Sequence, residues 1–156
     1  MKIAMGADAA GFELKNAVKK MIEDAGHEIL DFGSMDAEHA ISYVEAADKV
    51  AQAVSAGEVE RGILVCSTGM GMSIIANKHR GVYASVVESQ WAAHECRVIN
   101  NANVLCFGSR ILGQDMAMDI VKTFLSTGWR EGLPDFLFDY LGQLSKDVET
   151  FEASAF

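Results

Sequence analysis

Residues 61–73, Arg-Gly-Ile-Leu-Val-Cys-Ser-Thr-Gly-Met-Gly-Met-Ser, decide the class of fold. The run Ile63–Val65 is short and fully apolar, which predicts a buried strand. The small residues and glycines that follow it predict a loop leading into a helix. A buried strand joined in this way to a helix is the building unit of a parallel α/β sheet.

The same alternation of short apolar runs and longer amphipathic stretches extends in both directions from this unit. Four further strands are predicted at Ile3–Met5, Glu28–Phe32, Val82–Val87 and Val104–Phe107. Helices are predicted at Phe12–Ala25, Ser42–Ala56, Gln90–Val98 and Asp115–Leu125. Five strands separated by helices of ten or more residues imply an α/β fold, with a five-stranded parallel sheet covered by helices on both faces. Ligands bind beyond the carboxyl ends of the strands in such sheets.

Length and charge limit the classes of function. The 156 residues suit one domain, residues 1–156, and 22 acidic against 13 basic residues give a net charge of −9. This charge argues against nucleic acid and anionic membranes as partners, because both need a basic surface. Cys66, Cys96 and Cys106 are an odd number without metal-ligand spacing, which predicts free thiols. With no visible secretory signal or membrane span, we expect a cytoplasmic protein.

Residues 133–156 follow the last unit of the predicted sheet and begin near Pro134, the single proline. Their apolar side chains recur at helical spacing, at Phe136, Leu137, Tyr140, Leu141 and Leu144. This pattern predicts an extra C-terminal helix. An apolar helix appended to a finished domain usually packs on a neighbour, so we expect this helix to lie at an interface between subunits.

The loop at Cys66–Ser73 is the strongest candidate for chemistry. A helix start beside Cys66 favours its thiolate form, and the N–H groups from Ser67 to Gly71 can converge on an anion. A base beside such amides suits removal of a proton next to a carbonyl. Alternatively, Cys66 is a small buried residue in a tight turn. A cysteine phosphatase is excluded, because Met72 stands where that class needs an arginine.

Other polar residues are more ambiguous. Asp8 follows the first predicted strand, so it either contacts substrate, orients Thr68 or caps a helix. Tyr43 either contacts substrate or packs in the protein. The glycine-containing loops lack the dinucleotide and Walker patterns. No metal site is predicted, because metal-ligand spacing is absent among His27, His39, His79 and His94.

Four segments together resemble the family of ribose-5-phosphate isomerase B and galactose-6-phosphate isomerase. These segments are Gly6–Lys15, Asp31–Gly33, Arg61–Ser73 with Ala76–Lys78, and Asn100–Leu105. The resemblance implies a three-layer Rossmann-like fold and a cofactor-free conversion of an aldose to a ketose. It also implies a homodimer, or a dimer of dimers, in which the subunits share active sites.

The resemblance assigns roles to individual residues. The family's counterpart of Cys66 moves the proton between C1 and C2, and loop amides stabilise the cis-enediolate. Thr68 matches the residue for ring opening and hydroxyl contact. The implied substrate-binding residues are Asp8, Ala9, Tyr43, Ser67, Gly69, Met70, Gly71 and Asn100.

Several family residues are replaced in this chain. Ala9 and Ile99 stand where the family often has histidines, and Ile99 can neither donate nor accept a proton. Ser67 replaces a glycine. The family's phosphate-binding arginines are missing near the C terminus, where this chain has Glu131–Pro134 and then Leu137. Candidates for a relocated phosphate contact, each also explicable as a surface charge, are Arg130, Arg97, Lys78 and Arg80.

These replacements affect the expected substrate. Losing a ring-opening histidine harms closed-ring sugars more than a tetrose phosphate, which cannot close a ring through its phosphorylated hydroxyl. We therefore expect an aldose–ketose isomerase of a small sugar phosphate, with Cys66 as the base. The alternatives are an inactive sugar-binding homologue, a subunit of a mixed isomerase, and an isomerase of an unphosphorylated sugar.

Overall fold

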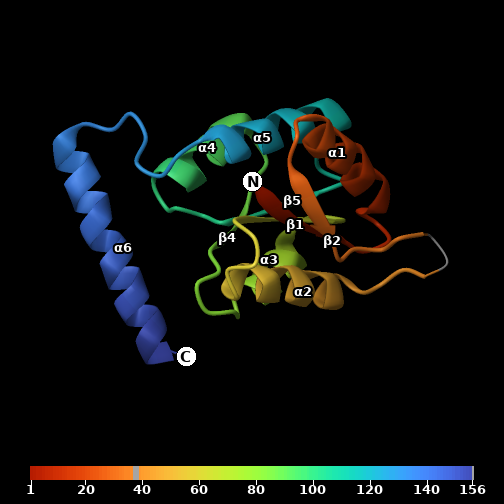
Figure 1. Ribbon diagram of the computed structural model, residues 1–156, viewed down its shortest axis with the longest axis horizontal. Coiled ribbons are helices and arrows are strands. Elements are labelled where there is room, and N and C mark those ends of the chain that lie inside the picture. The colour runs from red at the N-terminus through yellow and green to blue at the C-terminus, as the bar shows by residue number, and fades with distance from the viewer. Residues whose placement is uncertain (37–38, 156) are drawn as a thin grey trace.

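The computed structural model describes residues 1–36 and 39–155. These residues contain the predicted five-stranded parallel sheet with helices on both faces (Figure 1). The strands are β1 (Lys2–Ala7), β2 (Glu28–Asp31), β3 (Arg61–Cys66), β4 (Ala84–Val86) and β5 (Val104–Gly108). The helices are α1 (Phe12–Asp24), α2 (Tyr43–Ser55), α3 (Met70–Ala76), α4 (Gln90–Val98), α5 (Gln114–Ser126) and α6 (Asp135–Ala155). The three-layer Rossmann-like architecture is thereby confirmed.

The strand order is β2-β1-β3-β5-β4, and every pairing is parallel. The chain leaves β1 toward one side of the sheet and leaves β3 toward the other. Adjacent strands whose connections diverge in this way open a crevice between their carboxyl ends. Asp8 follows β1 and Cys66 ends β3, so the order of the strands brings these two predicted site residues to one crevice.

Each face of the sheet has its own apolar core. Helices α1, α4 and α5 cover one face, and α2 and α3 cover the other (Figure 1). Alternate residues of one strand serve opposite cores: Ile63 and Val65 belong to the first, and Leu64 and Cys66 to the second. This alternation explains why the predicted central strand is apolar throughout.

The structure corrects two lengths and confirms the predicted helix Gln90–Val98 as α4. Strand β4 has three residues rather than the six of Val82–Val87, and α3 has seven residues rather than the ten or more expected of a helix between strands. The Asn77 side chain ends α3 by bonding both the N–H and the carbonyl of Ala84, at 2.8 and 2.9 Å. The Tyr83 N–H bonds to the Asn103 side chain instead of a strand. Side-chain amides thus replace part of the predicted regular structure.

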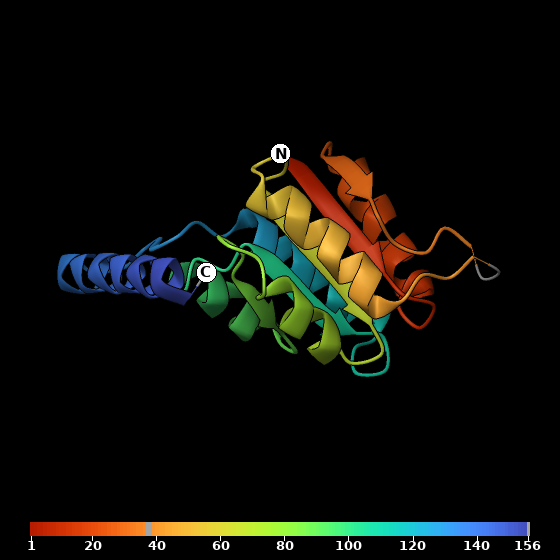
Figure 2. The ribbon, with the colours of Figure 1, turned by 90° about the horizontal axis from the view of Figure 1, so that it is seen from below.

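Helix α6 confirms the predicted C-terminal helix and lies apart from the sheet layers (Figure 2). Leu141 is its one buried residue among those described. A cavity of about 440 Å³ separates α6 from the rest of the chain, and its lining includes Ile99, Trp129 and Phe151. None of the described helices is long and apolar enough to cross a membrane.

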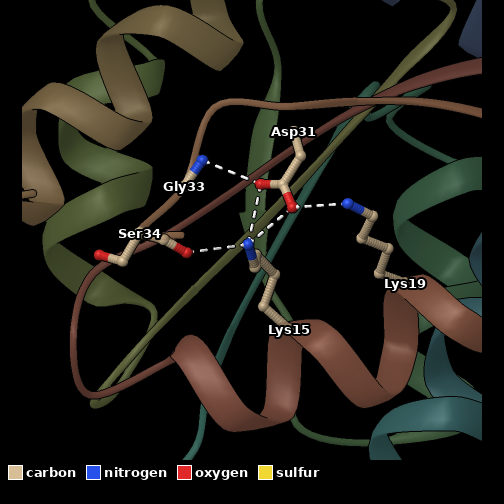
Figure 3. Close-up of polar contacts among 5 residues, drawn as sticks. All are labelled: Lys15, Lys19, Asp31, Gly33 and Ser34. Atoms are coloured by element: carbon tan, nitrogen blue, oxygen red, sulfur yellow. Dashed lines mark hydrogen bonds and ion pairs between the residues drawn. The ribbon is translucent and has the colours of Figure 1, made fainter. Parts of the chain in front are cut away.

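A buried ion cluster joins α1 to the end of β2 (Figure 3). The Asp31 carboxylate accepts hydrogen bonds from Lys15 Nζ at 2.7 and 2.9 Å, from Lys19 Nζ at 3.0 Å and from the Gly33 N–H at 3.0 Å. Burial raises the pKa of Asp31, but the hydrogen bonds from Lys15, Gly33 and Lys19 outweigh burial and hold the pKa below its ordinary value of 3.8.

This lowered pKa predicts a loss of stability in acid. Asp31 stabilises the fold fully above the pKa of the unfolded chain, near 3.9, and this contribution disappears as pH falls through the lower pKa of the folded state. We expect the free energy of unfolding of Asp31→Asn, measured in urea, to lie below that of the native protein at pH 6. The gap should narrow below about pH 4.

Asp24→Asn is the matched control, because Asp24 pairs with Lys20 at the surface and its side chain is 66% exposed. Its free energy of unfolding should stay close to that of the native protein throughout the titration, because exposed ion pairs contribute little. A gap for Asp31→Asn that stays constant down to pH 2.5 contradicts the assignment.

Candidate functional site

The Cys66 loop begins at the buried end of β3. Cys66 is 5% exposed, and its sulfur accepts a hydrogen bond from the Gly69 N–H at 3.1 Å. Gly69 belongs to the segment whose amides are expected to bind an anion, and its N–H is directed at the sulfur instead. The loop thus supplies a hydrogen-bond donor to the sulfur of Cys66.

The same loop lies very close to the end of β5. Gly69 has a φ of +79°, and a Cβ atom there would stand 2.8 Å from the backbone of Phe107. The Cys66 carbonyl accepts a hydrogen bond from the Ser109 N–H at 2.8 Å, and the Ser67 carbonyl accepts one from the Arg110 N–H at 3.1 Å. Only glycine combines this left-handed conformation with so close an approach to the Phe107 backbone. The loop is therefore held against the end of β5.

The loop after β1 lies against both of these segments. Asp8 Oδ1 accepts a hydrogen bond from the Gly11 N–H at 3.0 Å, within the loop before α1. Gly11 is the N-cap residue of α1 and no side chain caps this helix, so Asp8 does not have the capping role considered for it. The Ser109 hydroxyl donates to the Ala10 carbonyl at 2.7 Å. The loops after β1, β3 and β5 are therefore joined by hydrogen bonds around one crevice.

Tyr43 packs against the first turn of α3. It is the first residue of α2, and its ring lies over Gly71, where a Cβ atom would be 2.8 Å from Cε2. Thr68 is half-buried, and its hydroxyl is 3.5 Å from the Met70 N–H. The residues that the structure gathers at the carboxyl ends of the strands are Asp8, Ala9, Tyr43, Cys66, Ser67, Thr68, Gly69, Met70 and Gly71.

Three other candidates lie near the amino ends of the strands, at the opposite end of the sheet from Cys66. Asn100 precedes β5, Arg97 is in the last turn of α4, and Arg130 follows α5. The helices between parallel strands return toward the amino ends of the strands, so their C-termini are remote from Cys66 within one chain. The predicted site is therefore divided between two ends of the sheet.

The guanidinium groups of both arginines make contacts within the chain. Arg97 is 2% exposed and donates to the carbonyls of Thr127 and Ala102. Arg130 lies between the rings of Trp129 and Phe138, 4.0 and 3.8 Å from their centroids, and donates to the Phe138 carbonyl at 2.8 Å. The expected phosphate contacts do not fit these environments, because Arg97 braces the start of β5 and Arg130 anchors α6.

Arg110 is a candidate that the sequence reasoning missed. In the described parts of the loops that follow strands, it is the only Lys or Arg, and its side chain is exposed. Its N–H bonds to the Ser67 carbonyl, as described above, which attaches it to the Cys66 loop. Its position just after the predicted strand Val104–Phe107 is the sequence signal that indicates it.

The other two cysteines have environments unsuited to a base. Burial raises the pKa of Cys96 to about 11. Burial and the nearby Cys66 raise the pKa of Cys106 as well. Both remain thiols at neutral pH, which makes them unsuited to act as a base. The described residues contain no group of three or more His, Cys, Asp or Glu placed to hold a metal ion.

The sequence and the fold of this chain are similar to those of known proteins. Residues 3–134 match the Ribose/Galactose Isomerase family. The chain belongs to this family. The match includes β1 to β5 and stops at Pro134, so α6 lies outside the part that defines the ribose/galactose isomerases.

Named relatives cover nearly the whole chain. A protein of Clostridium sp. (strain MSTE9), named 4-deoxy-4-sulfo-D-erythrose isomerase, is 42% identical and covers 100% of this chain and 98% of its own length. Ribose-5-phosphate isomerase B of Escherichia coli (strain K12) is 41% identical, and the match covers 84% of this chain and 87% of that protein. The structure of Clostridium thermocellum ribose-5-phosphate isomerase B superposes with a TM-score of 0.84 and 36% identity. The match covers 97% of this chain and 99% of that chain.

Proposed function

We propose that this ribose/galactose isomerase homologue is a cofactor-independent aldose–ketose isomerase of a four-carbon sugar that carries a terminal anion. The observation that carries the proposal is the buried sulfur of Cys66, which accepts the Gly69 N–H at the carboxyl end of β3. Asp8 follows the neighbouring strand β1, and the Tyr43 ring lies over Gly71. Base, polar contacts and backbone amides stand together there, which is the arrangement that proton transfer beside a carbonyl needs.

In the proposed reaction, the Cys66 thiolate removes the proton from C2 of the open-chain aldose. The electron pair forms the C1–C2 double bond, and the negative charge moves to oxygen as a cis-enediolate. Amides of the segment from Ser67 to Gly71, other than that of Gly69, stabilise that charge, while Thr68 and Asp8 contact hydroxyl groups. The thiol then returns the proton to C1, and transfer of the O2 hydrogen to O1 completes the ketose.

The four-carbon substrate follows from Ile99. An isoleucine cannot transfer a proton during ring opening, so its presence disfavours closed-ring sugars relative to a substrate that is already open. A tetrose whose C4 carries an anionic group has no free C4 hydroxyl to close a five-membered ring. The relative named 4-deoxy-4-sulfo-D-erythrose isomerase, which matches the whole chain, supports a tetrose with a C4 sulfonate.

Arg110 is the proposed contact for the terminal anion. Its backbone N–H bonds to the Ser67 carbonyl, so its exposed side chain begins next to the Cys66 loop. Guanidinium groups bind two oxygens of an oxyanion with paired N–H groups. A sulfonate carries one negative charge, which one arginine balances. The net charge of −9 makes such a local cation necessary for attracting an anionic sugar.

We further infer that two copies of the chain share each active site. Asn100 can meet Cys66 only if a second subunit presents its opposite end, because one chain holds these residues at different ends of the sheet. Helix α6 exposes Phe136, Tyr140 and Phe151 by 76%, 59% and 73%, which is apolar surface for a partner to cover. Residues 1–156 then act as one catalytic domain, with α6 at the subunit interface. The three free thiols support a cytoplasmic location.

A substrate series tests the proposed function. The purified chain is incubated with 4-deoxy-4-sulfo-erythrose, erythrose 4-phosphate, ribose 5-phosphate and unsubstituted erythrose, and ketose formation is followed. We expect the sulfonated tetrose to have the highest kcat/KM and ribose 5-phosphate to be at least about 100-fold poorer, the usual cost of a missing acid–base group. Erythrose 4-phosphate separates a general requirement for a terminal anion from a preference for sulfonate.

Arg110→Gln should raise KM for the anionic tetroses and leave that for unsubstituted erythrose unchanged. Highest turnover with ribose 5-phosphate contradicts the four-carbon assignment. Highest turnover with unsubstituted erythrose indicates an isomerase of an uncharged sugar. Binding of these sugars without turnover indicates an inactive homologue or one subunit of a mixed isomerase.

A further inference from the structure

Lys15 is the most deeply buried charged side chain near the site. It lies in α1 and is 1% exposed, and its Nζ donates to both Asp31 carboxylate oxygens and to the Ser34 carbonyl at 3.1 Å (Figure 3). A buried ammonium group is costly unless hydrogen bonds satisfy it. All of these acceptors belong to residues 31–34, where the chain leaves β2.

Stability alone does not account for this arrangement. Apolar residues in place of a buried ion pair often leave a protein equally stable or more stable. Lys19 and the Gly33 N–H also hold Asp31, so the carboxylate keeps partners without Lys15. In the described part of the chain, Lys19 makes no hydrogen bond to Ser34. The contact with Ser34 therefore distinguishes Lys15 from Lys19.

Ser34 connects two parts of the active site. It is fully buried, and its N–H donates to the Ala7 carbonyl at 2.8 Å, next to Asp8. Its hydroxyl accepts a hydrogen bond from the Ile41 N–H at 3.1 Å. Ile41 is two residues before Tyr43, whose ring covers Gly71. The position of Ser34 thus affects where α2 begins and where the Tyr43 ring lies.

We propose that Lys15 and Asp31 are a positioning pair for the active site, which holds Ser34 so that Ile41 and then Tyr43 take their places over the Cys66 loop. Neither residue touches the substrate. The effect on catalysis rests on the proposed isomerase function, whereas the effect on Ile41 does not.

The two lysines provide a matched test. Lys15→Met and Lys19→Met each remove one positive charge from Asp31, but only the first loses the contact with Ser34. We expect Lys15→Met to raise KM about tenfold with kcat within about twofold, because a displaced Tyr43 ring weakens substrate binding more than proton transfer. Lys19→Met should keep both constants.

Hydrogen exchange of the Ile41 amide supplies a readout independent of activity. We expect faster exchange of this amide in Lys15→Met than in the native protein or in Lys19→Met. Ser34→Ala, which leaves the ion pair intact, should reproduce the effect on Ile41 and on KM. It also carries the test if Lys15→Met does not fold.

A double-mutant cycle tests the route through Tyr43. In a Tyr43→Ala background, Lys15→Met should add little to the increase in KM, because both changes act through the Tyr43 ring. Unchanged Ile41 exchange in both Lys15→Met and Ser34→Ala overturns the proposal, as do equal effects of the two lysine variants or additive effects with Tyr43→Ala. Inactivity of the native chain toward every sugar rejects the isomerase function, while Ile41 exchange still decides the positioning of that segment.

Discussion

Replacing Cys66 with alanine is expected to lower kcat by about 10²- to 10⁴-fold, the usual cost of a missing proton-transfer group. The variant should still fold, because the change removes one sulfur atom from a loop that Gly69 and the end of β5 hold in place. The measurements are the rate of ketose formation and the incorporation of deuterium from the solvent into the sugar. Both should fall together, since the same base performs both transfers.

Cys96→Ala is the control for this experiment. Cys96 is also buried, but it lies in α4 on the opposite face of the sheet, and its raised pKa keeps it a thiol. Its loss should leave kcat nearly unchanged. Cys106 cannot replace the missing base, because burial raises its pKa as well. Deuterium exchange by Cys66→Ala at the native rate removes the role assigned to this residue.

Mixing two impaired variants is expected to restore part of the native activity if subunits share their sites. Cys66→Ala removes the thiol at the carboxyl ends of the strands. Asn100→Ala removes the side-chain amide near the amino ends of the strands. Each variant alone should be impaired, Asn100→Ala by about 10- to 100-fold in kcat/KM through its lost hydrogen bonds. After the two are unfolded and refolded together, half of the dimers contain one chain of each kind. Each mixed dimer then has one intact site, so about a quarter of native activity returns.

Asp8→Ala provides the control for this mixing. Asp8 lies at the same end of the sheet as Cys66, so a mixed dimer of Cys66→Ala and Asp8→Ala contains no intact site. It should show no recovery. Absence of recovery with Asn100→Ala, in preparations where mass measurement confirms mixed dimers, contradicts shared sites. Full activity of Asn100→Ala alone contradicts a substrate contact at that position.

Local pattern was sufficient to predict much of the candidate site. The apolar run before Cys66 indicated a buried strand, and the glycines after it indicated a loop. Both depend on residues next to one another in the chain, because apolar side chains favour burial and glycine permits turns. The same reasoning placed Asp8 after β1 and Tyr43 near a helix start, and the structure brings both to the Cys66 crevice. It failed at β4, where side chains of Asn77 and Asn103 take over backbone hydrogen bonds.

The amino-acid pattern alone determined the parallel α/β class, the place of the Cys66 loop and the C-terminal helix, since each depends on the spacing of nearby residues. Only the tertiary structure decided that β5 lies between β3 and β4, that Arg97 and Arg130 bond to backbone carbonyls, and that Lys15 is buried against Asp31. The physical reason is that the spacing of apolar residues shows which face of a helix or strand is buried. It does not show which distant element packs against that face. Partners of buried charges come from that covering element, so they depend on the packing of the whole chain.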